Sequence, residues 1–199
     1  MKLNTDLVLA SRSPRRSALL NQMGLSFTVH PSAIEEVIEP DLTPAEVVQS
    51  LAYQKATAVA ALFPSALTLG ADTIVVLDGD ILGQPSDASN ASEMLHRLQG
   101  RSNFVYTGLA LIHPLSNRSA TAVECTKVSF GPMSEEEILA YVATGSPLDK
   151  AGSYGIQDDY GAQFISRIEG DYYTVVGLPI HRLYHLIRAE FMDLVVANV

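Results

Sequence analysis

Short apolar segments alternate with amphipathic ones along the chain, and this pattern predicts alternating strands and helices. Residues 7–10 and 67–77 are apolar and rich in β-branched side chains, which is typical of buried strands. Residues 103–113 and 120–130 predict two long strands joined by a polar turn. Asp78-Gly79 predicts the turn of a hairpin. Shorter strands are expected at residues 27–30, 80–82 and 163–168.

Capping signals mark the helices expected between these strands. Thr43 and Glu46 form a capping-box pattern, and so do Ser134 and Glu137. Because helices and strands alternate throughout, the predicted class is α/β, with a mixed, strongly twisted sheet flanked by helices. The expected helices span residues 14–23, 43–63, 87–98, 134–144 and 179–191.

The composition is that of a globular protein of 199 residues, enough for one compact domain or for two small lobes that share a core, and no separable linker is visible. Hydrophobic residues make up 47% of the chain, enough apolar surface to form a core. A formal net charge of −9 argues against a broad nucleic-acid surface, because binding a phosphate backbone needs a basic face. A small anionic ligand is still compatible, since a local cluster of cations or a bound metal can overcome the overall field.

The same composition bounds the compartment. No apolar run reaches the roughly 18 residues that a membrane span needs, so no membrane association is expected. The first residues include Asp6 and no long apolar stretch, so no signal peptide is expected. Cys125 is the only cysteine and therefore cannot form an internal disulfide or a multi-cysteine zinc site. We expect Cys125 to be a small core residue in a strand, and the compartment to be the cytoplasm.

The first segment that could carry chemistry is Ser-Arg-Ser-Pro-Arg-Arg at residues 11–16, between a predicted strand and a predicted helix start. Backbone N–H groups and the helix dipole favour anions there, and arginine forks match phosphate oxygens. The alternative is an ordinary helix start with solvated arginines. Because three arginines at this end oppose the dipole and one another, we expect an anion such as phosphate to accompany them.

Carboxylates supply the second kind of candidate. Asp72 lies inside an apolar run, where an aspartate needs a partner, a metal ion or a role as general base. A hydrogen-bonded structural aspartate is equally compatible with the segment alone. Glu35 and Glu36 are by default a solvated pair, with a metal role as the alternative, and Lys55 is by default a surface lysine.

The loop at residues 149–157 contains Gly152 and Gly155 among other small residues, which let a backbone approach a ligand. Gln157 at its end could read the edge of a base by paired hydrogen bonds. An ordinary surface loop is equally compatible with this segment.

Taken together, these segments resemble the Maf family of nucleoside triphosphate pyrophosphatases. The resemblance covers about residues 7 to 187, nearly the whole chain, and the order and spacing of its motifs are highly specific. The matching segments are Leu9-Ala10-Ser11-Arg12-Ser13-Pro14-Arg15-Arg16, Gly70-Ala71-Asp72-Thr73-Ile74-Val75, Leu98-Gln99-Gly100, Val105-Tyr106-Thr107-Gly108, residues 147–157 and Val175-Val176-Gly177-Leu178-Pro179.

The resemblance implies a fold related to the inosine triphosphate pyrophosphatases, with two lobes around a cleft, and a homodimer that uses magnesium or manganese. It implies that Asp72 accepts a proton and that Glu36 and Asp72 hold the metal. The phosphate- or metal-binding positions of the family fall on Ser11, Arg16, Glu36 and Lys55. The positions that mark the branch acting on dTTP and UTP fall on Arg15, Thr73 and Gln157.

One position departs from the family pattern, which usually has a lysine before the proline of a Gly-Lys-Pro segment. Here Gln84 precedes Pro85, so we assign Gln84 to substrate binding through a hydrogen bond without a charge. If Gln84 only lines a loop, a nearby cation such as Arg12 or Lys150 could compensate.

The expected reaction is hydrolysis of dTTP and UTP, or of modified pyrimidine triphosphates, to the monophosphate and pyrophosphate. One alternative is the same reaction on 7-methylguanosine triphosphate or another purine triphosphate. The other alternative is a non-catalytic nucleotide-binding regulator of septum formation, as the resemblance also suggests.

Overall fold

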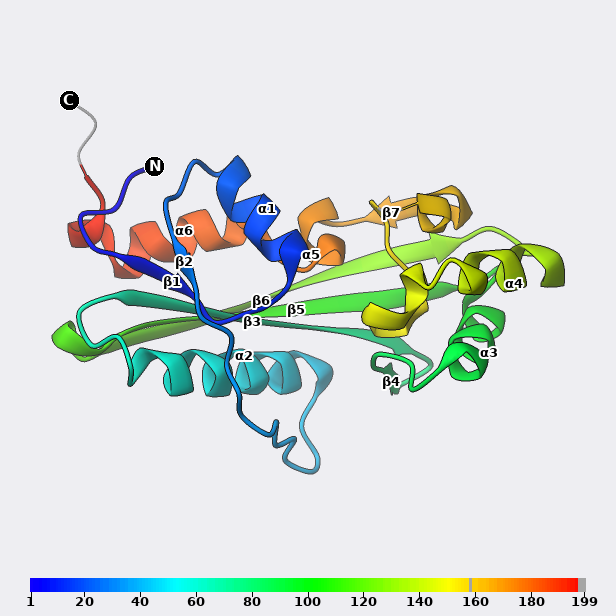
Figure 1. Ribbon diagram of the computed structural model, residues 1–199, viewed down its shortest axis with the longest axis horizontal. Coiled ribbons are helices and arrows are strands. Elements are labelled where there is room, and N and C mark those ends of the chain that lie inside the picture. The colour runs from blue at the N-terminus through cyan, green and yellow to red at the C-terminus, as the bar shows by residue number, and fades with distance from the viewer. Residues whose placement is uncertain (158, 197–199) are drawn as a thin grey trace. The chain divides into compact units, whose positions relative to one another are not determined.

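The computed structural model describes residues 1–157 and 159–196. Its strands form one sheet in the order β2-β1-β3-β5-β6-β7, with β4 paired to β3 (Figure 1). The strands are β1 (Leu7–Leu9), β2 (Thr28–Val29), β3 (Leu67–Leu77), β4 (Asp80–Leu82), β5 (Ser102–His113), β6 (Arg118–Phe130) and β7 (Ile165–Glu169). The α-helices are α1 (Pro14–Gln22), α2 (Pro44–Ala60), α3 (Ala88–Leu98), α4 (Glu135–Ala143), α5 (Tyr172–Val176) and α6 (Ile180–Glu190). Short 3₁₀ turns are η1 (Pro114–Ser116), η2 (Ser146–Asp149), η3 (Ala151–Ser153), η4 (Asp159–Phe164) and η5 (Met192–Leu194).

The sheet is mixed, as the sequence predicts. Strand β1 pairs in parallel with both β2 and β3, whereas β4 pairs antiparallel with β3, and β7 antiparallel with β6. Helices flank the sheet, which confirms the α/β class. Within the described residues, no helix is long and apolar enough to cross a membrane.

The chain folds into two compact units. The first contains Met1–Asp72, Thr107–Glu124 and the chain from Gly177 onward. In this unit α2 covers one face of the strands, and α1 and α6 cover the other (Figure 1). The core under α2 is lined by small side chains, because Ala52 and Ala56 of the helix pack against Ala110 of β5.

The second unit contains Thr73–Tyr106 and Cys125–Val176. Its core is larger and more aromatic than the alanine-lined core under α2, and it includes Val75, Leu95, Phe130 and Tyr141. Helix α3 packs against α4. Across this contact His96 Nε2 lies 2.6 Å from Glu135 Oε2 at the start of α4.

Turn and capping signals are confirmed where the sequence has them. Asp78 and Gly79 both have positive φ, 55° and 91°, as the tight hairpin between β3 and β4 requires. Both predicted capping boxes form, at the starts of α2 and α4. Local side-chain chemistry therefore sets these boundaries.

The differences from the prediction include the end of one helix and the presence of another. Helix α2 ends at Ala60 rather than Phe63, because the N–H groups of Leu62 and Phe63 donate to carbonyls only three residues back and tighten the chain before Pro64. Helix α5 was not predicted, since its sequence is aromatic and β-branched. Asp171 stabilises it by accepting hydrogen bonds from the backbone and hydroxyl of Thr174, at 2.7 and 2.8 Å.

The prediction that Cys125 is a core residue is wrong, because its side chain is exposed. Neighbouring Thr126 is fully buried, and successive residues of a strand face opposite sides. The inward position in this part of β6 therefore belongs to Thr126.

Candidate active site

Asp72 is the centre of the candidate site, in the middle of β3. It is only 8% exposed, and its carboxylate accepts a hydrogen bond from Lys55 Nζ at 2.5 Å. Burial raises the pKa of Asp72 above its ordinary value, although the positive charges of Lys55 and Arg16 act in the opposite direction. A carboxylate with a raised pKa and two cations nearby is suited to accept a proton during catalysis.

Helix α2 brings Lys55 to this carboxylate. Its ammonium lies between Asp72 Oδ1 at 2.5 Å and Glu36 Oε1 at 2.8 Å, and its side chain is 13% exposed. Gly70 makes the approach of the helix possible, because a Cβ at this position would collide with the backbone carbonyl of Ala52. Gly70 and Asp72 are two residues apart on the strand and therefore face the same side, toward α2.

Arg16, in the first turn of α1, is tied to two chain segments. Its Nε donates to the carbonyl of Gly177 at 2.9 Å, and its Nη1 donates to Ser11 Oγ at 3.1 Å. Burial lowers the pKa of Arg16, and the carboxylate of Asp72 is the strongest influence against that change. Arg16 is therefore not a solvated arginine of the kind that the sequence left open, whereas Arg12 is exposed.

At the start of α1, the side chain at the N-cap does not bind the backbone N–H groups, as expected of an anion site. Pro14 occupies its first turn, and the side chain of Ser13 at the N-cap makes no capping hydrogen bond. Ser11 Oγ instead accepts a hydrogen bond from the backbone N–H of Ser13 at 3.2 Å. This serine thus connects the helix start to the guanidinium of Arg16.

The residues present fit a magnesium-type ion. Glu36 and Asp72 offer oxygens within hydrogen-bond distance of the same nitrogen, so the two carboxylates converge. Among the described residues, no group of three or more histidine, cysteine or acidic side chains could hold a metal. Mg²⁺ needs only one or two carboxylates, because it keeps water and binds substrate phosphates. Glu36 and Asp72 would be its protein ligands.

The structure brings five of the predicted site residues together in the first unit. They are Ser11, Arg16, Glu36, Lys55 and Asp72. Arg15 lies beside Arg16 on α1 and its charge lowers the pKa of Arg16.

The remaining predicted residues, Thr73, Gln84 and Gln157, belong to the second unit. Thr73 follows Asp72 on β3, is partly buried and faces the opposite side of the strand. Gln157 is exposed at the end of the loop that follows η3. Their roles toward the base stay predictions.

Gln84 has a protein partner that its sequence does not suggest. Its Nε2 donates to the carbonyl of Asp149 at 3.1 Å, and nearby the N–H of Gly152 donates to the carbonyl of Gly83 at 3.0 Å. Gln84 thus helps to join its own loop to the loop at residues 149–157. Lys150, the cation considered as compensation, is buried and donates to the carbonyl of Ser146 at 2.6 Å.

Sequence reasoning missed two residues of the site. Gly177 accepts the hydrogen bond of Arg16, and its only signal was its place in a motif of the resembled family. Gln54, next to Lys55, binds the backbone of Val37 beside Glu36, a contact between residues 17 positions apart that no local pattern predicts.

The fold and the site define a mixed α/β protein with a cluster of carboxylates and cations around the buried carboxylate of Asp72. The chain belongs to the Maf family, because the family model described as Maf-like protein matches residues 6–190.

Relatives support this assignment over nearly the whole chain. A protein of Salinibacter ruber named dTTP/UTP pyrophosphatase is 55% identical over 100% of this chain and 97% of its own length. Proteins of the same name from Symbiobacterium thermophilum and Bacillus cytotoxicus are 50% and 52% identical, covering 92% and 88% of this chain and 92% and 91% of their own lengths. A comparison with solved structures is separate from this assignment: it finds the Ham1 protein of Staphylococcus aureus at 12% identity and a TM-score of 0.49, over 80% of this chain and 79% of that chain.

Proposed function

We propose that this protein hydrolyses dTTP and UTP to the nucleoside monophosphate and pyrophosphate. The observation that carries the proposal is the arrangement of Lys55 between Glu36 and Asp72, with Arg16 close enough to influence Asp72. Phosphoryl transfer needs positioned cations and a proton acceptor more than covalent chemistry, and this cluster supplies both. The relatives named dTTP/UTP pyrophosphatase support the choice of substrate.

In the proposed reaction a water molecule attacks the α-phosphorus. The bond from water oxygen to phosphorus forms, the bond from phosphorus to the oxygen that bridges to the β-phosphate breaks, and the proton of the water passes to Asp72. A divalent ion held by Glu36 and Asp72 would neutralise phosphate oxygens and lower the pKa of a coordinated water. Arg16 and Lys55 bind the triphosphate and stabilise the charge on the leaving pyrophosphate.

Lys55 has a second task in this mechanism. In the structure its ammonium is held by Asp72 and Glu36. A bound triphosphate adds negative charge that competes for the same ammonium, so Asp72 loses a partner when substrate arrives. Release of Lys55 leaves Asp72 Oδ1 without that hydrogen bond, so this oxygen can accept the proton of the water.

Discrimination among bases is assigned to Arg15, Thr73 and Gln157, with Gln84 as a neutral substrate contact. A purine is larger than a pyrimidine, and we expect steric exclusion to contribute to the preference. The hydroxyl of Thr73 and the amide of Gln157 are the groups that would form hydrogen bonds with the pyrimidine edge.

A panel of triphosphates with pyrophosphate detection tests the proposal. We expect kcat/KM to be highest for dTTP and UTP and lower for ATP, GTP and 7-methylguanosine triphosphate. Highest activity on 7-methylguanosine triphosphate would reassign the branch. Tight nucleotide binding without pyrophosphate release would instead indicate a nucleotide-binding regulator without catalytic activity.

We also propose magnesium or manganese as the cofactor, a homodimer as the assembly and the cytoplasm as the compartment. The convergence of Glu36 and Asp72 supports the metal. The resemblance to the family supports the dimer, and the single cysteine is compatible with a reducing compartment. Chelation with metal add-back, light scattering and cell fractionation test the three in turn.

A further inference from the structure

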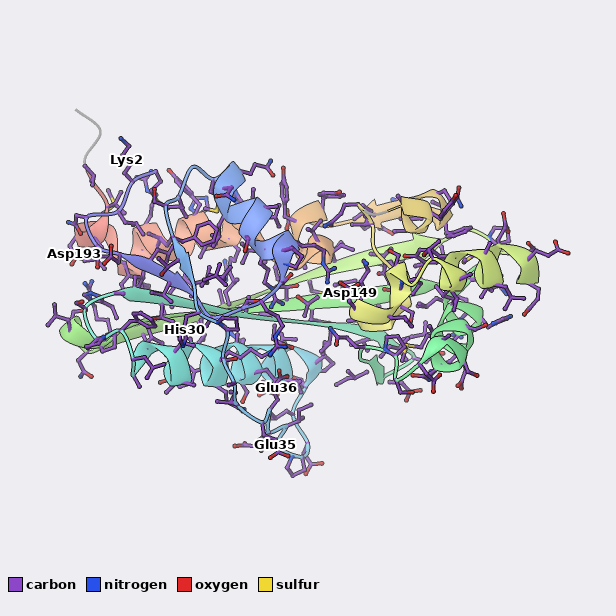
Figure 2. The ribbon with its side chains drawn as sticks, in the orientation of Figure 1. Lys2, His30, Glu35, Glu36, Asp149 and Asp193 are labelled. Atoms are coloured by element: carbon purple, nitrogen blue, oxygen red, sulfur yellow. The ribbon has the colours of Figure 1, made fainter. Side chains whose placement is uncertain are left out.

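The loop between β2 and α2 carries Glu36 and is held to α2 by one side chain. Val37 N donates to Gln54 Oε1 at 3.1 Å, and Gln54 Nε2 donates to the carbonyl of Val37 at 2.7 Å. The same Nε2 also donates to Ser50 Oγ at 3.1 Å, one turn earlier on the helix. Figure 2 shows Glu36 beside α2 and Glu35 farther out along the loop.

The amide of Gln54 binds Val37 in the way that a neighbouring strand would. A primary amide has one carbonyl oxygen and two N–H donors, so it can satisfy both backbone groups of one residue and still donate once more. Ser50 accepts that additional hydrogen bond and fixes the side-chain conformation. The loop therefore has a defined attachment point on α2.

This attachment point adjoins the active site along both chain segments. Val37 follows Glu36 in sequence, and Gln54 precedes Lys55, whose ammonium binds Glu36. The side chain of Glu36 is 45% exposed, so close packing does not hold it in place. Its position depends on the ion pair with Lys55 and on the backbone that Gln54 holds.

We propose that Gln54 is a positioning residue for Glu36, holding its carboxylate where it and Asp72 can share a divalent cation. This inference rests on the proposed function, in which Glu36 and Asp72 are the metal ligands. Groups that orient a metal ligand from outside typically change metal affinity by about 10- to 100-fold when removed. Because the ion pair with Lys55 remains in a Gln54 variant, we expect an effect near the lower end of that range.

The test compares Gln54→Met with Gln49→Met on the same helix. Methionine keeps the length and helix propensity of glutamine but cannot pair with Val37. Gln49 lies five residues earlier, about 140° around the helix, and so controls for the substitution itself. Gln54→Ala is the second variant, and thermal unfolding shows that each protein is folded.

The first readout is Mn²⁺ binding to nucleotide-free protein, measured by calorimetry. We expect roughly a tenfold higher Kd in both Gln54 variants and an unchanged Kd in Gln49→Met. The second readout is the metal dependence of dTTP hydrolysis, where the half-saturating Mn²⁺ concentration rises by a similar factor while kcat at saturating metal changes less. A merely structural defect would lower kcat without moving the metal dependence.

Amide hydrogen exchange gives a third readout that needs no metal. Loss of the hydrogen bond from Val37 N–H to Gln54 is expected to speed amide exchange at Val37 by about 3- to 10-fold, the effect of one ordinary hydrogen bond. Unchanged Mn²⁺ affinity in the Gln54 variants, with weaker binding in Glu36→Gln, would overturn the inference and leave the metal ligands in place. Unchanged binding in Glu36→Gln as well would instead overturn the metal assignment on which the inference rests.

Discussion

Replacing Asp72 by asparagine separates catalysis from folding at this site. Asparagine has nearly the same volume and keeps an oxygen that can accept the hydrogen bond of Lys55, but it cannot take a proton from water. Lys55 also keeps its ion pair with Glu36. The expected result is a folded protein that binds triphosphate and hardly turns it over.

The size of each effect follows from the surroundings of Asp72. Loss of a general base lowers kcat by about 10²- to 10⁴-fold, equivalent to about 2.7–5.4 kcal/mol of transition-state stabilisation. Burial raises the pKa of Asp72 despite the cations, so the folded protein disfavours its ionised form. A raised pKa contributes stability below the pKa of the unfolded chain, and this contribution is lost as the pH rises through the folded value. A neutral amide therefore leaves the melting temperature at pH 7 unchanged or higher.

The assay is pyrophosphate release from dTTP at saturating magnesium, with thermal unfolding and calorimetric dTTP binding on the same samples. Glu35→Gln is the matched control, because it removes one negative charge from the loop that also carries Glu36. We expect this control to keep kcat within about twofold, as is usual for an exposed charge. Near-normal turnover in Asp72→Asn would place the base elsewhere, and a melting temperature several degrees lower would refute the electrostatic reasoning.

Three further predictions address other parts of the molecule. Gln84→Lys can keep the hydrogen bond to the carbonyl of Asp149 and adds a positive charge. We therefore expect kcat/KM for dTTP to rise about 5- to 30-fold. An unchanged kcat/KM with the melting temperature preserved would show that Gln84 only joins two loops. Gly70→Ala should lower the free energy of unfolding by about 3 kcal/mol in urea titrations, because the methyl group meets the carbonyl of Ala52; a loss below 1 kcal/mol would contradict this close contact. The pKa of His96 is raised, first by a hydrogen bond to a backbone carbonyl of its own helix and second by the glutamate of α4. The charged imidazole therefore stabilises the fold below about pH 6.5, and this stabilisation is lost as the pH rises through the pKa of His96 in the folded protein. His96→Gln should therefore lower the melting temperature at pH 5.5 more than at pH 8.5, and equal losses at both would show that its charge is irrelevant.

Local chemistry explains which parts of the fold could be predicted. The hairpin at Asp78-Gly79 and the capping box of Thr43 are encoded within a few neighbouring residues, and both form as expected. Cys125 was misplaced because apolar character alone does not tell which face of a strand points inward. Helix α5 escaped prediction because the cap supplied by Asp171 outweighs the strand preference of the helix residues.

The candidate site shows the same division. A carboxylate within the apolar strand β3 singled out Asp72 from the sequence, and the burial of Asp72 agrees with that reasoning. Lys55, by contrast, has the local sequence of a surface lysine on a helix, and only tertiary packing places it against Asp72. The two hydrogen bonds between Gln54 and Val37 depend wholly on tertiary structure, because the local sequence around neither residue indicates a partner.

The close packing of α2 on the sheet affects how this protein can tolerate sequence change. Gly70 of β3 and Gly108 of β5 both leave room for backbone of α2, the first near Ala52 and the second near Val48. A larger side chain at either glycine would push the helix outward and carry Lys55 away from Asp72. In a survey of all single substitutions, we therefore expect both glycine positions to tolerate as few replacements as catalytic positions do, although neither glycine is assigned a contact with the nucleotide. Exposed positions such as Gln157 are expected to accept substitution, whereas the distance between α2 and the sheet depends on two residues that have no side chain at all.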